Sequence, residues 1–154
     1  MGGAWRGQRC GRAARASVGA DVVEQVGGND FVSVSVDHMR GVARVTRSAL
    51  RPPTIEAILE AFDEAARALD RLDRARFRVL IDLRAAPGRN DPEFERAMAS
   101  RRSDLLRGFI AAAVLVQTPV GELQISRITR EDRSDARVFS DEAKALAWLA
   151  ATRA

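Results

Sequence analysis

A regular alternation of apolar and polar residues comes early in the chain. In residues 31–36, three valines alternate with two serines, which is typical of a strand buried on one face. Residues 37–41 have the composition of a turn, and Val42 to Arg47 continue as a second strand. This pattern predicts an antiparallel hairpin.

Longer segments follow in which apolar residues recur every three or four positions. The first helix is expected from Thr54, a good capping residue, to about residue 70, and its apolar stripe runs from Ile55 to Leu72. Similar spacing, preceded by cap or proline signals, predicts further helices at 92–106, 118–128 and 140–149. We expect the outward charges of these helices, including Arg101 and Arg102, to lie in water.

A mostly apolar run occupies the middle of the chain, at Phe77 to Leu83, where five of the seven residues are apolar. Such a run is typical of a strand that is covered on both faces. Asp82 interrupts it where the strand should leave the core, and Pro87-Gly88 then turns the chain toward Asn90 or Asp91 as helix cap. Residues 109–117 and 136–139 are predicted to form the remaining strands.

The predicted order is ββαβαβαβα. Alternation of this kind indicates an α/β fold with a mixed, mostly parallel sheet, in which only the first pair of strands is antiparallel. Helices should cover the sheet, and we expect a core that contains Val34, Phe62, Leu69, Val79, Ile81, Phe94, Val114, Val116, Phe139 and Leu149.

Length and charge define one domain and an arm. The chain has 154 residues, 30% of them charged, and a formal net charge of +4. The four arginines of residues 1–20 account for that excess, because 21 basic and 21 acidic residues remain. We therefore predict a disordered or loosely held basic arm at 1–28, or a stretch upstream of the true start, and a single domain at 29–154. No nucleic-acid partner is expected.

The sequence lacks the residues that several kinds of site require. One cysteine and one histidine cannot form a disulfide within the chain or a zinc site made of Cys and His. No Gly-rich phosphate loop and no Gly-x-Ser-x-Gly elbow is present, and no apolar run approaches the roughly 18 residues of a membrane span. We expect a cytoplasmic, non-enzymatic protein without metal or cofactor, in which His38 is a solvated turn residue.

The strongest candidate site is the loop after the central strand, with Asp82, Arg84, Arg89 and Asn90. The carboxyl ends of inner strands are where open α/β sheets bind ligands. Two arginines beside a helix N-terminus would suit an anion. The alternatives are that Asp82 binds the backbone of its own loop, and that the arginines are surface residues paired with Asp91 or Glu93.

The strand Val79 to Asp82, the element order and the ending Val138 to Ala143 with Ala147-Trp148-Leu149 resemble SpoIIAA-like proteins of the STAS superfamily, often described as STAS/SEC14 domain-containing. The resemblance spans roughly residues 29–151. It implies the compact STAS architecture and a non-enzymatic binding or regulatory role. Anti-sigma antagonists of this superfamily carry a phosphorylated Ser or Thr after the strand-ending Asp, whereas Leu83-Arg84-Ala85-Ala86 follows here, so the phosphoswitch is not carried over.

Three functions are compatible with these patterns. The first is an interaction module whose contact face is the loop after Asp82 and whose partner is a protein with an acidic or phosphorylated surface. The second is a binder of a small ligand, lipid or acyl chain in an apolar pocket between helix and sheet. The third is an enzyme with Asp82 as base. A flat surface around Arg84 would favour the first function, and a cavity would favour the second.

Overall fold

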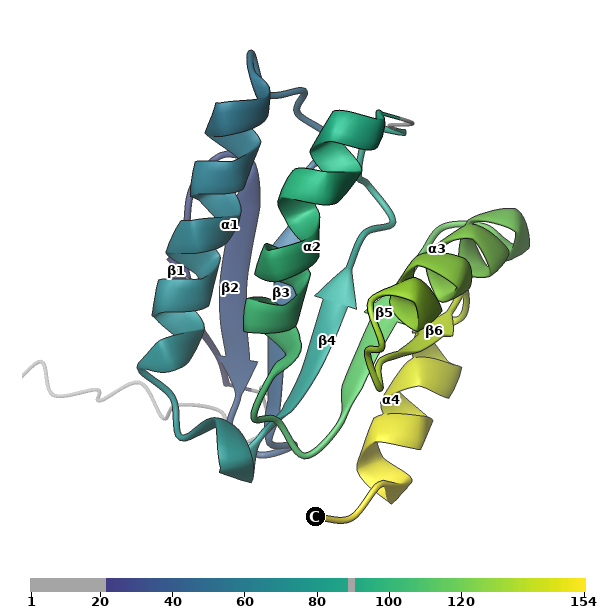
Figure 1. Ribbon diagram of the computed structural model, residues 1–154. Helices are drawn as coiled ribbons and strands as arrows, with labels where there is room; N and C mark the ends of the chain where they lie inside the picture. The colour runs from purple at the N-terminus through teal and green to yellow at the C-terminus, as the bar shows by residue number, and fades with distance from the viewer. Residues whose placement is uncertain (1–21, 89–90) are drawn as a thin grey trace, which may run out of the picture.

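The computed structural model describes residues 22–88 and 91–154 as a six-stranded mixed sheet with four α-helices (Figure 1). The α/β class predicted from the sequence is therefore confirmed. The strands are β1 (Val23–Gly28), β2 (Val32–Asp37), β3 (Val42–Arg47), β4 (Arg78–Asp82), β5 (Ala112–Leu115) and β6 (Arg137–Phe139). The helices are α1 (Ile55–Asp70), α2 (Pro92–Leu106), α3 (Pro119–Glu131) and α4 (Glu142–Ala151), with a 3₁₀ turn at Arg74–Arg76.

The strands lie side by side in chain order, from β1 to β6. The hairpin of β2 and β3 is antiparallel, and the pairs β3–β4, β4–β5 and β5–β6 are parallel, as the sequence predicts. The pair β1–β2 is antiparallel as well, so the expected order ββαβαβαβα, with a single antiparallel pair, is wrong by one strand at its start. Ile81 lies at the centre of the sheet, between Val45 of β3 and Val114 of β5.

The predicted boundary of the arm is wrong at its C-terminal end. Residues 23–28 form β1, which pairs antiparallel with β2 from Val23 opposite Asp37 to Gly28 opposite Ser33. The pattern was missed because this edge strand is mostly exposed and ends in two glycines. Gly28 has a φ of 140°, a conformation that side chains with a Cβ rarely adopt. Residues 1–21 of the predicted arm lie outside the described residues.

The two faces of the sheet carry different helices, and β4 shows the division. Val79 and Ile81 belong to the larger apolar cluster, which includes residues of α1 and α2 and is contacted by Ile125 of α3. Leu80 belongs to the smaller cluster, with residues of α4. The expected core residues are buried except Phe94 and Phe139, which are partly exposed.

Polar side chains fix where the helices begin. The Thr54 hydroxyl accepts a hydrogen bond from the Ala57 N–H at 3.2 Å, and Thr118 caps α3 in the same way. Of the two candidate caps of α2, Asp91 is the one that accepts a backbone hydrogen bond, from the Glu93 N–H, and Asp141 caps α4 in the same way. Each cap satisfies an N–H group that has no partner within its helix.

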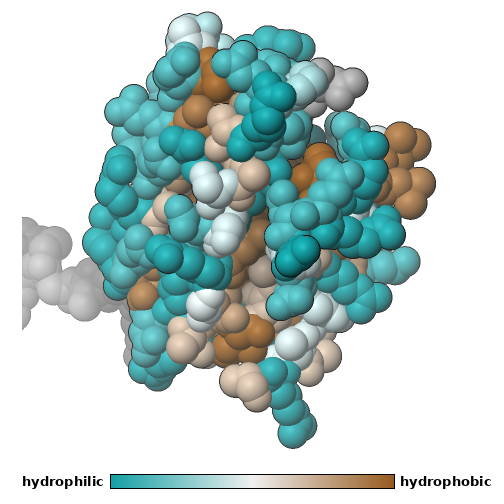
Figure 2. Space-filling view, viewed as in Figure 1, coloured by the Kyte–Doolittle hydropathy of each residue, from teal (hydrophilic) through white to brown (hydrophobic). Residues whose placement is uncertain are grey.

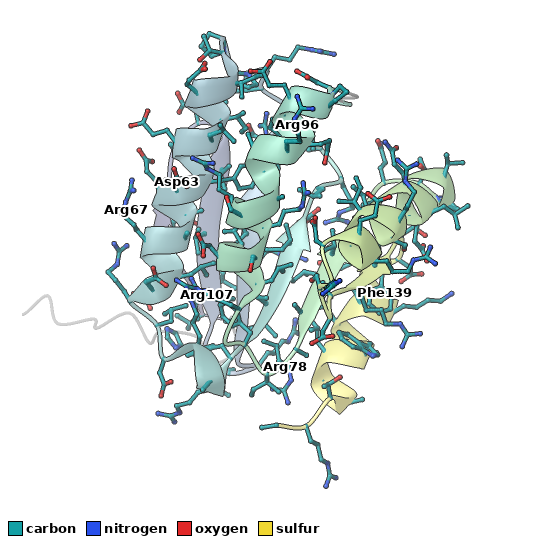
Figure 3. The ribbon with its side chains drawn as sticks, viewed as in Figure 1. Asp63, Arg67, Arg78, Arg96, Arg107 and Phe139 are labelled. Carbon is teal, nitrogen blue, oxygen red and sulfur yellow. The ribbon has the colours of Figure 1, made fainter. Side chains whose placement is uncertain are left out.

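The α2 helix is tied to α1 by an ion pair. The Arg101 guanidinium meets the Asp63 carboxylate through two hydrogen bonds of 3.0 and 3.2 Å. The expectation that Arg101 lies in water is therefore wrong. Figure 3 shows Asp63 on α1, Arg96 toward the beginning of α2 and Arg78 at the opposite end of the molecule. The carboxyl ends of the parallel strands lie toward the Arg96 end.

Candidate functional site

A cavity of about 730 Å³ lies among the sheet, α2 and α3. Its floor is formed by Ile81 and Val114, and its walls include Met98 of α2 and Ile125 of α3. Figure 2 shows hydrophobic surface in the depression between the more hydrophilic flanks. The volume falls within the roughly 300–1,000 Å³ of sites for small molecules. We call this space the α2–α3 cleft.

The cleft exists because its two wall helices lean on different neighbours. α2 packs against α1, whereas α3 packs against β6. Arg102 of α2 crosses between the walls: its Nε donates to Asp132 at the end of α3 at 2.6 Å, and its Nη1 donates to Glu95 at 3.0 Å. The expectation that Arg102 lies in water is thus also wrong. This ion-pair bridge joins the walls.

A buried arginine, Arg47, lies at the cleft. It is the last residue of β3, it lines the cavity, and its exposed fraction is 6%. The alternation of the strand places its side chain on the same face as Ala43 and Val45, both of which belong to the larger apolar cluster. Burial lowers the pKa of the Arg47 guanidinium, although an arginine keeps its proton at any physiological pH.

The hydrogen-bond partners of Arg47 are all neutral. Its Nη1 donates to the carbonyls of Phe31 and Ser48 at 3.2 and 2.6 Å and approaches the Ser48 hydroxyl at 3.3 Å. Its Nη2 donates to the Leu50 carbonyl at 2.8 Å, and the guanidinium lies 5.8 Å from the centre of the Phe31 ring. In the described part of the chain, no carboxylate forms an ion pair with it.

The predicted site residue Asp82 lies on the other face of β4, where only 5% of its surface is exposed. One edge of the Arg84 guanidinium binds both oxygens of its carboxylate: Nε donates to Oδ1 at 3.0 Å and Nη2 donates to Oδ2 at 2.7 Å. Burial alone would raise the pKa of Asp82, but the hydrogen bonds and charge of Arg84 outweigh it, so the pKa lies below its ordinary value.

A second carboxylate completes this network. Glu142, the first residue of α4, lies 2.9 Å from Arg84 and also pairs with Arg44 of β3. The hydrogen bonds to Asp82 raise the pKa of the Arg84 guanidinium. The network therefore joins two strands, the loop after β4 and α4.

The structure thus brings two of the four predicted site residues together and pairs them with each other. The Arg84 backbone N–H also donates to the Asp82 carboxylate at 3.2 Å. This bond agrees with the alternative expectation that Asp82 binds the backbone of its own loop. Arg89 and Asn90 lie outside the described residues. Arg84 offers no empty anion site, because two carboxylates already bind it.

Sequence reasoning missed Arg47, and it named an apolar pocket between helix and sheet only as an alternative, without the residues that line it. The signal for Arg47 was present, since a period-two strand places residue 47 on the face of Ala43 and Val45. No comparable signal exists for the cleft, because the spacing of apolar residues on α2 and α3 is the same whether they face a neighbour or a space.

Two further kinds of site receive no support in residues 22–88 and 91–154. No three or more Cys, His, Asp or Glu side chains gather there in a way that could hold a metal ion. None of the helices in these ranges has the length and apolar character needed to cross a bilayer.

The fold and cleft define the chain as an open α/β domain with a ligand-sized space at the carboxyl ends of its parallel strands. No family model matches the sequence, and no curated protein or solved structure matches it significantly.

Proposed function

We propose that this domain binds a small, largely apolar molecule in the α2–α3 cleft. The observation that carries the proposal is the cavity of about 730 Å³ with an aliphatic floor. Such a space loses water when an apolar ligand enters, and burial of apolar surface favours binding by about 25 cal/mol per Å² before entropic costs. The position of the cleft supports the proposal, because open α/β sheets bind ligands at the carboxyl ends of their strands.

Binding fits the cleft better than catalysis does. Its described lining contains no serine, cysteine, histidine or aspartate, and its one carboxylate, Glu95, is held by Arg102. Its two threonine hydroxyls bind the backbone of α3, since Thr118 accepts from the Gly121 N–H and Thr129 donates to the Ser126 carbonyl. No described base of the lining is hydrogen-bonded to either hydroxyl, so a nucleophile activated by a base is missing there. Asp82 is a poor base as well, because its pKa is lowered and Arg84 holds both carboxylate oxygens.

The interaction module centred on the loop after Asp82 has less support. Its two described members, Asp82 and Arg84, bind each other, and Arg84 also binds Glu142. A regulatory role of the STAS kind and a cytoplasmic location remain predictions from the sequence. A module of that kind could carry a ligand in the cleft, so the two ideas are compatible.

The test uses N-phenylnaphthylamine, a neutral apolar dye whose fluorescence rises when it leaves water. The full chain should bind it at one saturable site. Ile125→Trp adds a large side chain to the α3 wall and should weaken binding about tenfold or more. The matched control is Leu123→Trp on the same helix, where the replaced leucine is 72% exposed and outside the cleft lining, and binding should stay unchanged.

The thermal unfolding of both variants shows whether they remain folded. If the dye fails to bind the full chain, or if both tryptophan variants bind it as tightly as the parent does, the cleft is not a ligand site and the proposal is wrong.

A further inference from the structure

We infer that the ligand of the α2–α3 cleft is an amphipathic carboxylic acid whose carboxylate binds Arg47. This inference rests on the proposed function and adds the chemical class of the ligand. The charged guanidinium of Arg47 is buried beside an apolar cavity, and no carboxylate of the described residues pairs with it. The other features of the cleft then narrow the class of ligand.

Burying a charge without a partner is costly, and proteins normally pair such groups. The guanidinium of Arg47 has only carbonyl and hydroxyl partners within the described chain. By contrast, Arg84 and Arg102, which also line the cleft, each form ion pairs with two carboxylates. Arg47 is therefore the buried cation of the lining that lacks an anion.

The donors of Arg47 also leave room for one. A guanidinium has five N–H donors. The two on Nη1 and one on Nη2 are used, whereas the Nε–H has no partner among the described residues. The Nε and Nη2 edge is the one through which Arg84 holds both oxygens of Asp82. The same bidentate geometry suits a carboxylate that arrives with a ligand.

The charge near Arg47 favours a monoanion over a cation. Arg51 also lines the cleft, is exposed, and forms no ion pair with a described residue. The acid of the lining, Glu95, is neutralised by Arg102. A ligand with a positive head would thus meet two unpaired cations, while a negative head would meet opposite charge and an apolar floor for its tail.

The competing explanation is that Arg47 is only a structural anchor for residues 48–50, whose carbonyls it binds. The two explanations differ in one measurable property, which is the selectivity of the cleft for the head group of a ligand. An anchor would have no such selectivity. A ligand-binding arginine would discriminate among molecules with the same tail.

The experiment displaces bound N-phenylnaphthylamine from the full chain with decanoate, decanol or decyltrimethylammonium, which share a ten-carbon tail. Decanoate should compete about tenfold better than decanol, because a hydrogen bond to a charged group contributes about that factor, and the ammonium should compete worst. Equal competition by decanoate and decanol would overturn the inference. Because the dye is neutral, its own binding would still support the proposed function.

Variants then assign the selectivity to a residue. Arg47→Met should abolish the preference for decanoate while decanol still competes, and Arg47→Lys should keep part of it because it retains charge without the fork. Arg67→Met on the exposed side of α1 is the control and should change nothing. Preserved selectivity in a folded Arg47→Met variant would overturn the inference. If that variant does not fold, the head-group comparison on the parent chain decides alone.

Discussion

The pair formed by Asp82 and Arg84 should respond unequally to the loss of each partner. Asp82 is almost fully buried, whereas 40% of the Arg84 side chain is exposed. Replacing Arg84 with Met leaves a buried carboxylate without its two charged hydrogen bonds. Replacing Asp82 with Asn leaves an arginine that keeps Glu142 and reaches water. We therefore expect Arg84→Met to destabilise the protein more than Asp82→Asn does.

The magnitudes follow from burial. Removing one partner of a fully buried ion pair costs about 3–5 kcal/mol. Because Arg84 is exposed by more than a third, solvent screens part of the interaction, and about 2 kcal/mol is expected for Arg84→Met at pH 7. Asp82→Asn retains a side-chain oxygen that can accept one hydrogen bond, so its cost should be about 1 kcal/mol.

The pH dependence gives the reasoning a second test. The folded-state pKa of Asp82 is lowered, so the network stabilises the protein above the unfolded-state pKa of about 3.9. This contribution is lost as the pH falls through the folded-state pKa. Urea denaturation of the parent and both variants between pH 7 and pH 3 measures it, and the difference between Arg84→Met and Asp82→Asn should shrink at the acidic end. If Asp82→Asn is the costlier change, or if the difference is the same at all pH values, the assignment of Asp82 as the buried, charged member is wrong.

Two further predictions concern packing and use the free energy of unfolding in urea. Ile81→Ala should cost about 2–3 kcal/mol, at the low end of the usual range because Ile81 borders the cleft, and Leu80→Ala on the α4 face should cost more; a cost below about 1 kcal/mol for Ile81→Ala would contradict the central position of β4. Gly27→Ala should cost about 1–3 kcal/mol, because its Cβ would lie 2.6 Å from the Cβ of Ala68 in α1. The control Gly88→Ala meets nothing within 4 Å, and equal effects at both glycines would mean that β1 does not pack closely on α1.

Much of the fold was predictable because the strongest signals are local. The alternation of residues 32–36, the apolar run ending at Asp82 and the Thr-Pro start of α3 each depend on a few neighbouring side chains, and all three elements are found. β1 was not predictable in this way. Its close contact with Ala68 requires glycine at position 27. Because glycine has no side chain, it adds nothing to the alternation of apolar and polar residues by which a strand is recognised in the sequence.

The site was predictable only in part, for a similar reason. Strand order correctly placed Asp82 at the carboxyl end of an inner strand. Its partners could not be inferred from spacing, because Glu142 comes from α4 and meets Arg84 only after the sheet and helix have packed. Asp82 and Arg84, which the sequence suggests as partner-binding residues, thus form ion pairs within the fold. Arg47, which looks like the end of an ordinary strand, is left with neutral partners.

The network and the cleft are joined through one loop. Asp82 and Glu142 hold Arg84 from the α4 side of the sheet, while Leu83, Arg84 and residues 86–88 line the cleft on the other side. Residues 83, 84 and 86–88 therefore form part of a cleft wall, and the ion pairs of Arg84 on the opposite side of the sheet hold that wall in place. A wall held in this way keeps its shape without a ligand, and a preformed cavity loses less conformational entropy on binding than one that must be ordered. Asp82 and Arg84, which first suggested a contact face, would then serve the proposed site by holding this wall in place.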